Sequence, residues 1–127
     1  MSWRYFNPNP VGKNVEDCTV RAICAVEGMT WSEAYHLLCD MGNIVYDLPN
    51  ANEVFRAVLR KLGYSRHTIP NTCPDCYTVA EFCRDYPIGK YILGTGTHVI
   101  AVINGNYYDS SNSGNEVPLY FYKKEND

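Results

Sequence analysis

Three side chains in this sequence could together perform nucleophilic chemistry: a thiol, an imidazole and a carboxylate. Cys18 begins an apolar segment of helical character, and His98 and Asp109 lie far downstream on either side of Asn104-Gly105. A thiol attacks a carbonyl carbon as its thiolate, so it needs a base and surroundings that stabilise negative charge. The base in turn needs a third group that fixes the orientation of its ring. The order Cys, His, Asp supplies these three roles.

A hairpin would bring the imidazole and the carboxylate together. An Asn-Gly pair between two β-like segments is a strong signal for a two-residue turn. If Asn104-Gly105 is that turn, Ile103 pairs with Asn106, and alternation places His98 and Asp109 on one face as diagonal neighbours. The Cα atoms of such neighbours are roughly 7–8 Å apart, which side chains of this length can bridge. A slip of one residue would separate them, so the site depends on this register.

The position of Cys18 favours reactivity of its thiol. A helix is expected over residues 18–27, with Asp17 as its N-cap and Gly28 at its end. Exposed N–H groups and the helix dipole lower the pKa of a thiol at a helix N-terminus. The alternative is that Cys18 is structural, like the other five cysteines. Asp109, at the end of a strand beside a cleft, is expected to contribute little packing.

The remaining pattern predicts an α+β fold in one domain, residues 1–127. A looped or extended arm over residues 1–16 precedes the first helix, and further helices are expected over 30–41, 50–62 and 78–85. Short β-branched or aromatic segments then predict strands over 90–95, 97–103, 106–110 and 117–123. Helices followed by strands favour an antiparallel sheet, and a helix that is apolar on most sides belongs at the centre of the fold.

Composition argues against several classes of function. Hydrophobic residues make up 46% of the chain and the net charge is −3, so we expect a packed core and neither nucleic acid nor an anionic membrane as partner. We see no apolar segment long enough to span a bilayer and no signal-peptide pattern. These features predict a cytoplasmic protein with reduced thiols. They leave the oligomeric state open.

A second group of potential ligands surrounds a Cys-x-x-Cys motif. Cys73 and Cys76 are flanked by His67 and Cys83. A zinc site needs four ligands at suitable spacing, and one such pair without a second is only half of that pattern. We therefore expect no bound metal and no cofactor, and interpret these cysteines as part of a turn before the last helix.

At this point the chain resembles the papain-like cysteine peptidases, most closely the small C39-like peptidases of bacteria and their phages. The matching segments are Asp17-Cys18-Thr19-Val20-Arg21-Ala22, Thr97-His98-Val99-Ile100-Ala101-Val102 and Gly105-Asn106-Tyr107-Tyr108-Asp109. The resemblance implies a papain-like fold, in which a central helix bearing the nucleophile packs on a C-terminal sheet. It also implies a peptide or another amide-containing molecule as substrate.

The resemblance further implies the role of each site residue. Cys18 would be the nucleophile, His98 the general base and acid, and Asp109 the orienting residue. An amide side chain before the nucleophile, usually Gln, would help the Cys18 N–H stabilise the oxyanion. The chain contains no Gln, and Asn14 is the nearest substitute.

Two alternatives to a hydrolase remain open. The same triad serves enzymes of the transglutaminase and arylamine acetyltransferase kind, which pass the acyl group to an amine. The missing Gln would also suit a binding or inhibitory protein on the same scaffold, because a fold does not fix a function.

Overall fold

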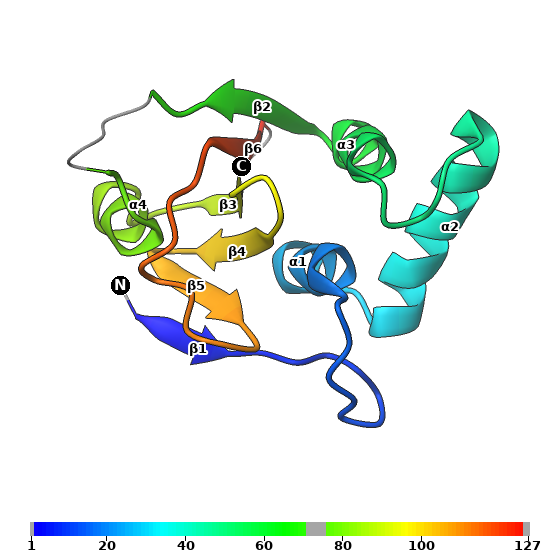
Figure 1. Cartoon of the computed structure of the whole chain (residues 1–127), viewed down its shortest axis with the longest axis horizontal. Coiled ribbons are helices and arrows are strands. Elements are labelled where there is room, and N and C mark those ends of the chain that lie inside the picture. The colour runs from blue at the N-terminus through cyan, green and yellow to red at the C-terminus, as the bar shows by residue number, and fades with distance from the viewer. Residues whose placement is uncertain (1, 71–75, 126–127) are drawn as a thin grey trace.

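The computed structural model describes residues 2–70 and 76–125 and forms an α+β fold (Figure 1). The helices are α1 (Cys18–Glu27), α2 (Trp31–Val45), α3 (Asn52–Lys61) and α4 (Val79–Asp85). The strands are β1 (Trp3–Tyr5), β2 (Tyr64–Thr68), β3 (Lys90–Gly94), β4 (Val99–Ile103), β5 (Asn106–Asp109) and β6 (Tyr120–Lys124).

All six strands belong to one sheet with the order β1-β5-β4-β3-β6-β2. The pairs β3–β4, β4–β5, β3–β6 and β2–β6 are antiparallel, whereas β1 pairs with β5 in parallel. The sheet is therefore mixed, and the expectation of a purely antiparallel sheet was wrong at this edge. The error arose because residues 1–16 were expected to form a looped or extended arm outside the sheet, whereas Trp3–Tyr5 adds a parallel strand to it.

Helices cover both faces of the sheet. In Figure 1, α1, α2 and α3 lie on one side and α4 lies on the other. The side chains of β4 alternate accordingly: Val99 and Ala101 pack in the core beneath the first three helices, and Ile100 and Val102 pack in the core beneath α4. α1 is the central helix, because it contacts β3, β4 and β5 on one side and α2 on the other.

Two features of the helices and strands differ from the sequence-based prediction. α2 continues beyond Met41 to Val45, with Gly42 buried inside it. A side chain at Gly42 would place its Cβ 2.6 Å from the Asp47 carbonyl oxygen, so glycine permits a close approach here and does not end the helix. β2 was not expected, because its sequence YSRHT lacks an apolar alternation and most of its side chains are exposed.

Within residues 2–70 and 76–125, none of the helices has the length and apolar character that crossing a membrane requires. The longest of them, α2, contains 15 residues.

Candidate active site

The predicted hairpin forms and brings His98 and Asp109 into contact. Asn104 and Gly105 both have positive φ, 49° and 77°, as this type of tight turn requires. Ile103 pairs with Asn106, which confirms the predicted register. His98 immediately precedes β4 and Asp109 ends β5, and Nε2 of His98 lies 2.7 Å from Oδ2 of Asp109.

Cys18 begins α1, as predicted, and its thiol is hydrogen-bonded to the imidazole of His98. Because Nε2 of His98 faces Asp109, Nδ1 is the ring nitrogen left for the sulfur atom. Burial opposes ionisation of the thiol, but hydrogen bonds from the His98 side chain and the Val99 backbone favour the thiolate. The nearby positive charges of His98 and Arg21 add to this effect, and the pKa of Cys18 is lowered.

The imidazole is held in its charged form. Hydrogen bonds to Asp109 and Cys18 raise the pKa of His98 to about 10, against the opposing effect of burial. A lowered thiol pKa beside a raised imidazole pKa favours a thiolate–imidazolium pair. The arrangement therefore favours an ionised thiol beside a group that can donate a proton.

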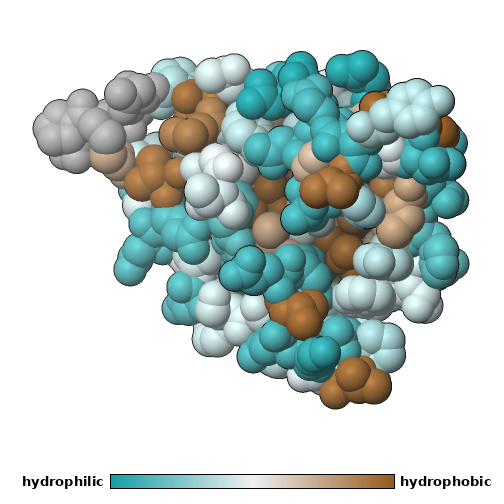
Figure 2. All heavy atoms as spheres, turned by 45° about the vertical axis from the view of Figure 1, so that its right-hand side comes forward, coloured by the Kyte–Doolittle hydropathy of each residue, from teal (hydrophilic) through white to brown (hydrophobic). Residues whose placement is uncertain are grey.

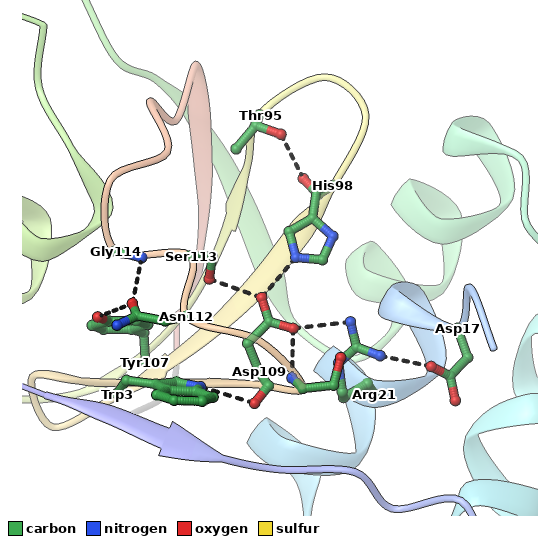
Figure 3. A network of polar contacts seen from close by, with 11 residues as sticks. Trp3, Asp17, Arg21, Thr95, His98, Tyr107, Asp109, Asn112, Ser113 and Gly114 are labelled. Carbon is green, nitrogen blue, oxygen red and sulfur yellow. Dashed lines mark hydrogen bonds and ion pairs between the residues drawn. The ribbon is translucent and has the colours of Figure 1, made fainter. Parts of the chain in front are cut away.

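Asp109 lies at the centre of a hydrogen-bond network (Figure 3). Its Oδ2 accepts from Ser113 Oγ at 2.8 Å in addition to His98, and its Oδ1 accepts from the Ser110 N–H at 2.7 Å. Burial opposes ionisation, but the donors and positive charges around the carboxylate keep the pKa of Asp109 below its ordinary value. Asp109 is fully buried, so the expectation that it contributes little packing is corrected.

The second cation beside Asp109 is Arg21, which sequence analysis did not single out. Nη2 of Arg21 lies 3.0 Å from Oδ1 of Asp109, and its Nη1 donates to Oδ1 of Asp17 at 2.6 Å. The other oxygen of Asp17 accepts from Trp31 Nε1 at 2.8 Å. Asp17 therefore does not cap α1 with its side chain, contrary to expectation.

The sequence does contain a signal for this buried network. Arg21 is the buried charge of a mainly apolar helix whose other charged residue, Glu27, stands at its last position, and charged side chains are rarely buried without a partner. Asp17 lies one helical turn before Arg21, at the spacing that allows an ion pair. Asp109 could not be inferred as the second partner, because that contact depends on how the helix lies on the sheet.

The thiol of Cys18 opens into a small polar pocket of about 170 Å³. Its walls come from the start of α1, the start of α3, the segment before β4 and the start of β6. They comprise Glu16, Cys18, Thr19, Asn50, Asn52, Gly96, Thr97, His98, Val99 and Tyr120.

Asn14 does not line this pocket; it is exposed in the segment before α1. The amides that do line it belong to Asn50 and Asn52, which the sequence placed at the start of the helix expected over residues 50–62. Two asparagines in one short segment are a weak signal for a site. Their proximity to Cys18 depends on the packing of α3 against the sheet.

The other described cysteines differ from Cys18. Burial raises the pKa of Cys24 and of Cys83 to about 11, so both favour the thiol form. Cys76 is disulfide-bonded, which corrects the expectation that all thiols are reduced, and Cys73 lies outside the described residues. In the described part of the chain, no three His, Cys, Asp or Glu side chains are grouped as metal ligands.

Comparisons with known proteins do not assign this site. No protein-family model, curated protein or solved structure matches the chain. The arrangement of Cys18, His98 and Asp109, with the residues around them, is what points to a function.

Proposed function

We propose that this protein is a thiol-dependent hydrolase that cleaves peptide or other amide bonds through an acyl-enzyme. The observation that carries the proposal is the contact series from Cys18 through His98 to Asp109, at the N-terminus of the central helix. The surroundings of Cys18 meet the conditions that a cysteine nucleophile requires: a lowered thiol pKa, a protonated partner and an orienting carboxylate. On the same grounds we propose that the domain is papain-like and of the C39-like kind.

The residues would act in two steps. The Cys18 thiolate attacks the carbonyl carbon, the carbon–nitrogen bond breaks, and the imidazolium of His98 gives its proton to the leaving amine. This leaves a thioester on Sγ and a neutral imidazole. His98 then takes a proton from water as the water attacks the thioester, and the carboxylic acid leaves while the thiolate–imidazolium pair is restored. Asp109 keeps the ring oriented and stabilises its positive charge throughout.

The negative charge that develops on the substrate oxygen needs hydrogen-bond donors. The first N–H groups of a helix have no acceptor within that helix, so the N–H of Cys18 suits this role. In place of Asn14, we assign the second donor to an amide that lines the pocket, Asn50 or Asn52. Neutral donors of this kind add no charge that would disturb the ion pair.

A second hollow suggests the kind of acyl group that fits. It has a volume of about 250 Å³ and shares Glu16, Thr19 and Asn50 with the pocket at Cys18. Its walls include the stacked rings of Trp31 and Tyr35, whose centroids are 5.0 Å apart. We propose that an apolar side chain of the acyl group lies there, because apolar walls favour apolar ligands.

The face of the molecule shown in Figure 2 gives less support to a docking protein than to an enzyme. On this face, hydrophobic residues form small groups that hydrophilic residues separate. Protein-binding surfaces usually expose a contiguous apolar patch, rimmed by polar residues. The polar pocket at Cys18 is more characteristic of a site that orients a small group.

The test is hydrolysis of a library of acyl aminocoumarin amides, with rapid acid quenching and mass spectrometry of the protein. The expected result is release of the amine, greater for apolar than for charged acyl groups, with an acyl adduct on Cys18. Cys18→Ala should lose both signals and Cys39→Ala, a matched control on α2, should keep them. If neither turnover nor an adduct appears with the wild-type protein, or if Cys18→Ala retains turnover, the proposal is wrong.

A further inference from the structure

A buried guanidinium bridges two carboxylates beside the proposed triad (Figure 3). Arg21 contacts Asp17 with one terminal nitrogen and Asp109 with the other, at 2.6 and 3.0 Å. The exposed fractions of these three residues are 5%, 7% and 0%, respectively. Water therefore screens this network much less than it screens a surface ion pair.

Stability alone gives a weak reason for this arrangement. Replacing a buried ion pair by apolar side chains of similar size is often neutral or stabilising, because removing charges from water is costly. The helix around Arg21 consists mainly of apolar residues, so an apolar side chain would suit its packing. A contribution to the site explains the position of the charge better.

We propose that Arg21 is a positioning residue, which holds the Asp109 carboxylate ionised and aimed at His98 so that the Cys18 thiolate forms. The inference rests on the proposed function and assigns to that site a residue outside the triad. Arg21 fixes Oδ1 of Asp109, which leaves Oδ2 directed at Nε2 of His98. Its positive charge also favours the thiolate at Cys18.

The charges around the network fix the direction of the effect. Asp17 and Cys18 face it from the start of α1, His98 from the residue before β4, and Asp109 from β5. From α2 the contact is the neutral indole of Trp31. Without the guanidinium, the carboxylates of Asp17 and Asp109 would have no cation between them, and Cys18 would lose one of the positive charges that favour its thiolate. The thiolate would then be harder to form.

The test is the pH profile of Cys18 alkylation by iodoacetamide, measured by mass spectrometry on folded protein. For Arg21→Met we expect the acid limb of the profile to move upward by about one pH unit. Alkylation would then be about tenfold slower at a pH below the limb. Arg21→Lys retains the positive charge, so the acid limb of its alkylation profile should stay near that of the wild type. Its single nitrogen cannot contact both carboxylates as the guanidinium does.

Controls separate this role from a structural one. Arg84→Met makes the same substitution at an exposed arginine that pairs with the surface carboxylates of Glu81 and Asp85, and it should leave the limb unmoved. If Arg21→Met unfolds, Arg21→Met combined with Asp17→Asn removes one buried carboxylate and is measured instead. An unmoved limb in the folded Met variant, or an equal shift in Arg21→Lys, would overturn the inference.

The same experiment distinguishes failure of the inference from failure of the proposed function. Alkylation reports the thiolate and requires no turnover. If the wild-type limb lies at the pH of an ordinary thiol, Cys18 is not activated and both proposals fail. If the wild-type limb is low and Arg21→Met does not move it, only the role of Arg21 is lost.

Discussion

Replacing Asp109 with Asn tests whether the carboxylate supports the fold as well as the site. The variant keeps the size of the side chain and removes its charge. Four donors surround the two oxygens: His98, Arg21, Ser113 and the Ser110 N–H. The NH₂ group of Asn would face at least one of these donors, and the buried Arg21 would lose one of its two partners.

The expected loss of stability is about 3–5 kcal/mol, the usual cost of removing one partner from a buried ion pair. Adding a separate value for every donor would overestimate it, because neighbouring interactions are not additive. A domain of this size is commonly stable by about 5–15 kcal/mol, so the variant should be weakened while remaining measurable.

The assay is urea unfolding at neutral pH, with the slope of the free energy against urea as a check that the unfolded states are comparable. Asp40→Asn, at an exposed position of α2, is the control and should change the free energy of unfolding by less than about 0.5 kcal/mol. A loss below about 1 kcal/mol in Asp109→Asn would refute the assignment of Asp109 as an ionised, buried partner.

The pH dependence of that loss follows from the two pKa shifts. The pKa of Asp109 is lowered, so its contribution is complete above its unfolded value of about 3.9 and disappears as the pH falls through the folded value. The pKa of His98 is raised to about 10. Its contribution is therefore complete below the unfolded value of about 6.5 and is lost as the pH rises through about 10. The difference between wild type and variant should be largest between about pH 5 and 6.5.

Two further predictions follow from the thiols and from the packing of α2. At neutral pH, iodoacetamide should modify Cys18 at least about tenfold faster than Cys24 or Cys83, because the latter two thiols are buried and have a raised pKa. Peptide mapping by mass spectrometry would measure the three rates, and equal rates would contradict the prediction. Gly42→Ala should lower the free energy of unfolding, measured in urea, by about 1–3 kcal/mol, because the added Cβ would clash with the Asp47 carbonyl oxygen. An unchanged unfolding midpoint would show that the loop after α2 can move to accommodate the methyl group.

The site was predictable where local sequence signals determine geometry. Asn104-Gly105 specifies a turn type, the turn specifies the register, and the register places His98 beside Asp109. The start of α1 at Cys18 was also predictable from the apolar segment that follows.

The rest depends on contacts that no short segment encodes. β1 has three exposed side chains and is recruited by backbone pairing to β5, a strand distant in the sequence. Arg21 finds Asp109 only because α1 lies across β4 and β5. Asn50 and Asn52 likewise reach the pocket through the docking of α3. These arrangements follow from packing of the whole domain, which residue spacing does not reveal.

The pairing of β1 with β5 has a consequence during synthesis on the ribosome. The indole N–H of Trp3 donates to the Asp109 carbonyl at 3.0 Å, across a separation of 106 residues. The first strand and Cys18 therefore leave the ribosome long before β4 and β5 exist. A nascent chain that ends before His98 carries Cys18 as an ordinary thiol without its base. The contacts that Cys18, His98 and Asp109 make are therefore assembled only after most of the chain has been translated.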